Sequence, residues 1–336
     1  MKITNILLIM ILYHNFVVSA NDTLVPVEMC NAISDFILSG NYDLAENAAD
    51  SLISAQPDEP IGPLLKASVL QYECIDYEDF SREEDFYRLL DTTEKNAEKQ
   101  MNLDRNDLWA RYFLCASYGL RGARASITGQ FVYGVIKGRS GAMGMRDIII
   151  DDPDFYDAYL LFGSYRFWKS VVIGSVTWFP FIEDESTVGI SEVKKSIEYG
   201  VLTGPLSNTV LIEMYLSYNP ELAVDLAEEM LELYPSCRLF SWQLGEAYKR
   251  LGSYDDAERI FSGIALSMKD DKRDDGSGEL RSWWKLAVLA NSVGKTEECL
   301  YYCNKIIDLG ERESVFKRQR ERINKAIRMK EVLENE

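Results

Sequence analysis

Residues 244–264 read LGEAYKRLGSYDDAERIFSGI. Apolar and small residues recur every three to four positions on both sides of Gly252, which indicates two helices joined by a tight turn. Gly245 and Ala257 are small enough to let the two helices approach closely, and Tyr248 and Phe261 are expected to fill the space between successive pairs. This stretch therefore predicts one helix–turn–helix unit.

The same pattern recurs along the chain. A shift of 34 residues toward the N-terminus places small or apolar residues at the matching positions of the second helix: Ala223, Ala227 and Met230. A shift of 42 residues toward the C-terminus gives residues in the same roles along the whole unit: Leu286, Ala287 and Ala290 in the first helix, Gly294 at the turn, and Cys299, Cys303 and Ile306 in the second helix. The eight additional residues fall in the loop 270–278, which is polar and is therefore expected to stay unburied. Residues 40–52 repeat the turn and the second helix near the N-terminus.

These units resemble tetratricopeptide repeats, which have a period of about 34 residues. The resemblance is strong over 208–310 and weak over 80–205, and residues 152–170 are similar to uncharacterised exported bacterial proteins with such repeats. It implies an all-α fold, a right-handed superhelical solenoid of about six antiparallel helix pairs, with a polar C-terminal capping helix.

The expected domains are a signal peptide over 1–20, the solenoid over 21–313 and the capping helix over 314–336. In the weaker region the helices look longer. They are expected over 82–101, 108–122, 126–150 and 158–172.

The chain has 336 residues and a formal net charge of −18. Because nucleic-acid binding needs a concentrated positive surface, this charge argues against a nucleic-acid partner. Residues 1–20 combine Lys2, an apolar run over 6–12 and the sequence Val18-Ser19-Ala20, which predicts a secretory signal cleaved after Ala20. The protein is therefore expected to be exported, periplasmic or secreted. The alternative is an uncleaved anchor, although the apolar run is shorter than the ~20 residues of a spanning helix.

The single histidine, His14, lies in that segment, so the exported chain would contain none. A chain without histidine has no Ser-His-Asp or Cys-His nucleophile system and no histidine metal ligand. Carboxylate pairs and lysine bases remain available, but we expect no enzyme, no catalytic residue, no metal and no cofactor. The composition and the repeats favour a non-enzymatic scaffold that binds another protein or a peptide.

Six cysteines in an exported chain raise the question of disulfides. Cys299 and Cys303 occupy packing positions of a second helix, and their spacing on one helix suits a disulfide poorly. We therefore expect both to be buried thiols. The other cysteines are far apart in sequence, and distant repeats of a solenoid are not expected to touch. Cys74 with Cys115 or with Cys30 is the most plausible remaining bridge, and the redox state stays open.

The glycine-rich residues 134–144 lack the Gly-Lys-Ser/Thr ending and the preceding strand of a phosphate-binding loop. We interpret their glycines as points of close helix contact. A small-ligand site is a weaker alternative, based on the basic cluster of Arg121, Arg124, Lys137 and Arg139. These charges can equally neutralise carboxylates or stabilise helix ends.

In tetratricopeptide folds the first helix of each pair lines a concave groove, so the resemblance implies a peptide-binding site. By position, the groove residues are Trp242, Glu246, Lys249, Arg250, Arg281, Trp284 and Asn291, with Ser164, Phe167 and Trp168 from an earlier unit. Two tryptophans beside cations suit an extended peptide with acidic side chains or a terminal carboxylate. The alternative is that Trp242 and Trp284 are buried by the adjacent repeat or by the terminal helix.

The segment 171–182 is apolar and aromatic, and Gly174 and Pro180 interrupt it. Twelve residues cannot span a bilayer, so we expect the segment to pack against the solenoid. The alternative function rests on this segment: an envelope-assembly or membrane-associated component that contacts a membrane or a membrane partner through it.

Overall fold

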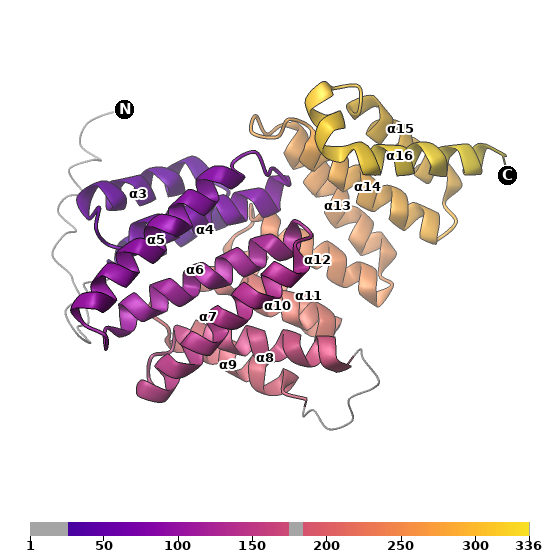
Figure 1. Ribbon diagram of the computed structural model, residues 1–336. Coiled ribbons are helices and arrows are strands. Elements are labelled where there is room, and N and C mark those ends of the chain that lie inside the picture. The colour runs from indigo at the N-terminus through magenta and orange to yellow at the C-terminus, as the bar shows by residue number, and fades with distance from the viewer. Residues whose placement is uncertain (1–25, 175–183, 336) are drawn as a thin grey trace. The chain divides into compact units, whose positions relative to one another are not determined.

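The computed structural model describes residues 26–174 and 184–335. Over these ranges it contains fifteen α-helices, one short 3-10 helix and no strand (Figure 1). The expected all-α class is confirmed. The predicted signal segment 1–20 lies outside the described residues, as do residues 175–182 of the apolar segment.

The described chain forms two compact units. The first comprises the residues up to Ile37, Asn41–Gln71 and Glu83–Ser207, and the second comprises Leu38–Gly40, Tyr72–Arg82 and the chain from Asn208 onward. The helices that begin in the first unit are α2 (Val27–Leu38), α3 (Tyr42–Ala55), α4 (Ile61–Tyr77), α5 (Glu83–Leu103), α6 (Leu108–Ile127), α7 (Phe131–Asp151), α8 (Ala158–Gly174), α9 (Ser186–Tyr199) and the 3-10 helix η1 (Pro205–Ser207). The helices of the second unit are α10 (Asn208–Tyr218), α11 (Pro220–Leu233), α12 (Arg238–Leu251), α13 (Tyr254–Lys269), α14 (Ser277–Ser292), α15 (Thr296–Leu309) and α16 (Glu313–Asn335).

Antiparallel helix pairs build the second unit, and the α12–α13 pair forms as its sequence predicts. Gly252 ends α12 in the left-handed conformation, with a φ of 77°, which a residue with a side chain adopts only at a cost. A Cβ on Gly245 would lie 2.6 Å from the Phe261 ring, so this glycine makes room for the aromatic side chain. The close approach of the two helices at Gly245 is confirmed, but the Phe261 ring packs within this pair, where we expected it to fill the space between successive pairs.

Helices α2 to α15 make seven consecutive pairs in the described residues, one more than the expected number of about six, and α16 follows them. The terminal helix packs on α14 and α15. It buries Val315, Ile323 and Ala326, whereas Ile327 and Val332 remain exposed. A polar helix with few apolar contacts therefore covers the last pair.

Helix α6 of the first unit is longer than expected, and α7 begins later than expected, at Phe131. We placed a break near residues 122–126, but α6 continues to Ile127 and the turn lies at Gly129, which has a φ of 80°. Gly122 fails to end the helix because it is a packing residue: a Cβ there would lie 2.8 Å from the backbone nitrogen of Gly138. A Cβ on Gly141 would similarly lie 2.6 Å from the carbonyl oxygen of Cys115. The interpretation of these glycines as points of close helix contact is confirmed.

One part of the second unit departs from a simple repeat. Residues 72–82 are the end of α4 and the loop after it, and their long-range hydrogen bonds reach residues 137 to 244 positions later in the chain. The expectation that distant repeats do not touch is therefore wrong for this segment.

Candidate functional site

An acidic stretch forms the C-terminal turns of α4 and the start of the loop after it. Residues 73–79 read ECIDYED, with four carboxylates in seven residues, and we call them the acidic segment. Glu78 has a φ of 51°, which ends the helix and turns the chain. Five arginines of the same unit contact this segment. They form the arginine cluster: Arg238, Arg273, Arg281, Arg318 and Arg322.

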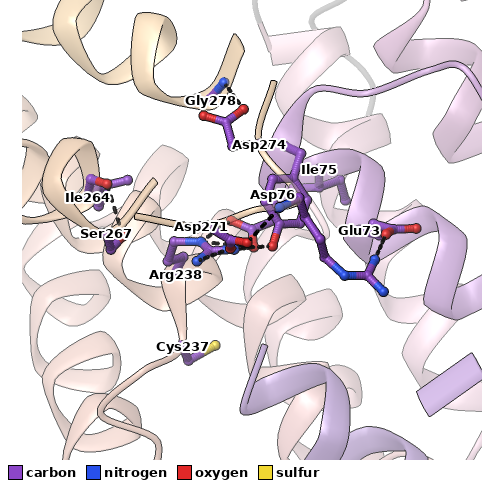
Figure 2. Close-up of polar contacts among 12 residues, drawn as sticks. Glu73, Ile75, Asp76, Cys237, Arg238, Ile264, Ser267, Asp271, Asp274 and Gly278 are labelled. Atoms are coloured by element: carbon purple, nitrogen blue, oxygen red, sulfur yellow. Dashed lines mark hydrogen bonds and ion pairs between the residues drawn. The ribbon is translucent and has the colours of Figure 1, made fainter. Parts of the chain in front are cut away.

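The most buried contact joins Asp76 to Arg238, the first residue of α12. Asp76 is 1% exposed, and the Nη2 and Nε atoms of Arg238 donate to its two oxygens at 2.7 and 3.0 Å. Figure 2 shows Arg238 directed at both Asp76 and Asp271, and its Nη1 lies 3.0 Å from the second carboxylate. The Tyr77 hydroxyl donates to Asp271 at 2.6 Å. Such forked, charge-assisted contacts fix position as well as charge.

Arg281 links the acidic segment to a predicted groove residue. Its guanidinium lies 4.0 Å from the ring centroid of Trp242, donates to the carbonyl oxygen of Ile75 at 2.8 Å and lies 3.3 Å from a Glu78 oxygen. Arg322 of α16 donates to both oxygens of Glu78. Burial alone would raise the pKa of the Glu78 carboxyl, but the hydrogen bond from Arg322 and the charges of Arg281 and Arg322 lower it to about 2. Glu78 is therefore a fully ionised anchor.

The outer contacts of the segment are more exposed. Glu73 accepts hydrogen bonds from Arg273 and, at 3.1 Å, from Arg82, while Asp79 lies 3.2 Å from Arg318. Beside them opens a cavity of about 350 Å³, lined by Glu78, Phe80, Ser81, Arg318, Gln319 and Arg322. Solvent thus reaches this end of the arginine cluster, whereas the Asp76 end is closed.

The loop 270–278 supports the site and is more buried than expected. The Asp274 carboxylate accepts from the backbone nitrogen of Gly278 at 2.8 Å (Figure 2). It also accepts from the backbone nitrogen of Glu279 at 2.8 Å. These bonds give partners to backbone N–H groups in the first turn of α14, so Gly276, Ser277 and Gly278 can be buried. The expectation of an unburied polar loop is wrong because its carboxylates pair with its own backbone.

The predicted groove residues lie in both units. Trp242 is only 5% exposed, since Arg281 covers its face, and Trp284 is partly buried. Glu246 accepts from Lys285 and from Lys249, and Arg250 donates to the Leu216 carbonyl. Asn291 is exposed. Ser164, Phe167 and Trp168 belong to α8 of the first unit, where Phe167 is fully buried.

Trp242 and Arg281 are thus together, as predicted, but they contact the chain's own acidic segment rather than an open groove. The use of the ten residues as a peptide site stays a prediction. Sequence reasoning missed the acidic segment itself. Its signal was present: four carboxylates fall within seven residues.

The six cysteines are all buried free thiols, so Cys74 forms no disulfide with Cys115 or Cys30. Cys299 and Cys303 are fully buried in α15, which confirms their packing role. In the two described ranges we find no group of three or more potential ligands that could hold a metal ion. Nor does any described helix combine the length and the apolar character that crossing a bilayer requires.

The basic cluster proposed as a small-ligand site divides into two parts. Arg121 pairs with Asp91 and Glu94, and the buried Arg124 donates to Gln71 and to the Leu70 carbonyl. These two arginines therefore serve the packing of the first unit. Lys137 and Arg139 lie further along the next helix.

Comparisons with known proteins were made for the whole chain. No family model and no curated protein matches it. It is similar to the crystal structure of a tetratricopeptide repeat protein from Parabacteroides merdae, with 11% identity, 89% of this chain and 98% of that chain covered, and a TM-score of 0.40. It is also similar to the C-terminal part of a repeat protein of the same type from Cytophaga hutchinsonii (14% identity, 86% and 98% covered, TM-score 0.37) and to yeast Tom70 (13% identity, 90% and 69% covered, TM-score 0.38). Because these TM-scores are low, we base the tetratricopeptide-like fold on the helix pairs of this chain itself.

Proposed function

We propose that the protein is a non-enzymatic, protein-binding scaffold whose second unit recognises an acidic segment through the arginine cluster. The observation that carries this proposal is the set of contacts made by residues 73–79, which pair four carboxylates with five arginines. In the structure the ligand is part of the same chain. An acidic segment of another protein would use the same donors when this segment is released.

The chemistry sets the specificity of the proposed site. Arginine holds carboxylates in forked geometry, so the spacing of Asp76 and Glu78 determines which peptide fits. The stacking of Arg281 on Trp242 orients one guanidinium. A peptide with aligned carboxylates is expected to bind, and the same peptide with amides is not.

The test uses the full chain and a fluorescent peptide of residues 70–82. An internal segment competes at an effective concentration of about millimolar, so wild type should bind the peptide weakly. Glu78→Gln loosens the internal segment and should raise the affinity at least fivefold, whereas the exposed control Glu221→Gln should not change it. Adding Arg322→Ala to Glu78→Gln should remove the gain.

The proposal fails if a peptide with Gln and Asn in place of its four acids binds Glu78→Gln as tightly as the acidic peptide. It also fails if Glu78→Gln, shown by circular dichroism to be folded, binds the peptide no better than wild type.

The second part of the proposal is that residues 1–20 direct export, so that the scaffold acts outside the cytoplasm. Support comes from the apolar run and from Val18-Ser19-Ala20. N-terminal sequencing of the mature protein from a bacterial host should begin at Asn21. A chain that keeps Met1 would contradict cleavage.

A further inference from the structure

The tip of the α6–α7 hairpin carries contiguous exposed apolar side chains. Five of them lie between 48% and 77% exposed, and we call them the hairpin tip: Ile127, Phe131, Val132, Val135 and Ile136. Those on α7 are three or four residues apart, so they form one ridge. Single exposed apolar residues are ordinary on a protein surface, but a ridge of neighbours indicates a docking site.

Helix α8 extends the apolar area of the same unit. It packs on α7 in the antiparallel sense, since Gly141 meets Leu161 and Arg139 lies 3.4 Å from the Tyr165 hydroxyl. This register carries the exposed end of α8, Val171 and Val172, toward the start of α7. The apolar area therefore spans two helices.

The charge beside the hairpin tip is opposite to that of the whole protein. Residues 108–146 contain six arginines and lysines and no aspartate or glutamate, in a chain with a net charge of −18. In the described part of the chain, neither Lys137 nor Arg139 has a carboxylate partner. Lys137 lies over the Tyr118 ring and Arg139 near Tyr165. Acids of α5 also lie on this side: burial and Glu83 raise the pKa of Tyr87, and burial, Glu94 and Glu98 raise the pKa of Tyr118.

The hairpin that carries this tip is rigid. Glycines of α6 and α7 bring the two backbones into direct contact, so that a Cβ on Gly134 would lie 3.0 Å from the Gly122 carbonyl oxygen. A preformed apolar edge loses little conformational freedom when it docks. This rigidity suits insertion of the tip as a unit.

From these observations we propose that the hairpin tip docks onto an anionic lipid bilayer. Phe131, Val132 and Val135 enter the boundary between headgroups and acyl chains, while Lys137 and Arg139 reach the phosphates. Cations one turn behind an apolar edge are typical of helices that lie in a membrane interface. A second copy of this chain is a poorer occupant, because in a symmetric pair Lys137 and Arg139 of one copy would lie near the same cations of the other. The proposal is independent of the arginine cluster.

The test is vesicle flotation of the full chain with phosphatidylcholine vesicles, with and without phosphatidylglycerol. Wild type should float with the anionic vesicles and much less with the neutral ones. Val132→Ser combined with Val135→Ser should lower the partition coefficient at least tenfold. Leu103→Ser is the matched control, since Leu103 is 85% exposed on α5 of the same unit, and it should have no effect. All three positions are exposed, so the variants should fold as wild type does.

Lys137→Gln combined with Arg139→Gln should reduce the preference for anionic vesicles and its salt dependence. The proposal is overturned if wild type floats with neither vesicle, or if Leu103→Ser lowers binding as much as the tip variant does. It is also overturned if light scattering shows a dimer that the tip variant dissociates while flotation is unchanged, because the tip would then join two copies.

Discussion

The α6–α7 hairpin of the first unit and the α12–α13 pair of the second solve the same packing problem differently. In α12–α13 a glycine faces an aromatic ring, Gly245 against Phe261, and the helices have 14 and 16 residues. In α6–α7 glycine faces glycine, and the helices have 20 and 21 residues. A ring fills one position, whereas glycines let two backbones stay in contact over several turns.

The two units also differ in what covers their surfaces. The second unit holds residues 73–79 on its arginine cluster, so Trp242 and Asp76 are buried by the chain itself. The first unit leaves the hairpin tip exposed. An internal segment thus covers the arginine cluster of the second unit, whereas the apolar ridge of the first unit stays exposed to solvent.

The largest expected effect is the loss of Arg238. Arg238→Ala leaves the buried carboxylate of Asp76 without its forked partner, and breaking such a pair costs about 3–5 kcal/mol. Urea unfolding followed by circular dichroism should show this loss. The control is Arg88→Ala in α5, whose pair with Asp85 is exposed, and it should change stability by about 0.5 kcal/mol or less. A loss below about 1 kcal/mol for Arg238→Ala would show that the acidic segment is not held by this pair.

The second prediction concerns pH. The pKa of Glu78 is about 2 in the folded chain against an ordinary value of 4.5, so its ionised form stabilises the fold above pH 4.5. That contribution is lost as the pH falls through about 2, and the shift corresponds to about 3 kcal/mol. Glu78→Gln should therefore lose stability near neutral pH and show a flatter decline between pH 4.5 and 2. Glu313→Gln, at an exposed position, should follow the wild-type curve. Parallel curves for wild type and Glu78→Gln would contradict the assignment.

Local sequence was enough to predict the helix pairs of the second unit. Gly252 turns the chain, Gly245 lets the two helices approach closely and Cys299 packs as a small apolar residue, because each role depends on neighbours within one repeat. The break between α6 and α7 was misplaced because a glycine in a helix contact and a glycine in a turn look alike in sequence. Only the structure assigns contact to Gly122 and the turn to Gly129.

The candidate site could be predicted only in part. Repeat position placed Trp242 and Arg281 together, and the structure shows them stacked. Their partner could not be found that way, since Asp76 and Arg238 are 162 residues apart and no periodicity connects them. Charge counting along the chain would have identified the acidic segment, but not the arginines that bind it.

The third prediction tests glycine-on-glycine packing directly. Gly141→Ala would place a Cβ 2.6 Å from the Cys115 carbonyl oxygen, and backbone on both sides cannot yield without moving a helix. We expect a loss of about 1–3 kcal/mol in urea unfolding. Gly138→Ala in the same helix is the control, because its Cβ would meet nothing within 4 Å, and it should gain up to about 1 kcal/mol. Equal behaviour of the two variants would show that α6 and α7 are not in close contact.

The smallest effect compares the turns of the two units. Gly129 and Gly252 have φ values of 80° and 77°, and a Cβ on either would meet nothing within 4 Å. Alanine at each position therefore tests backbone conformation alone, and each should cost about 1–2 kcal/mol. Gly263→Ala in α13, where φ is ordinary and space is open, should not destabilise. Equal losses of stability at the two turns would show that the two units differ in how their helices pack and not in their turns. A loss only for Gly252→Ala would show that the longer α6–α7 hairpin does not depend on its turn.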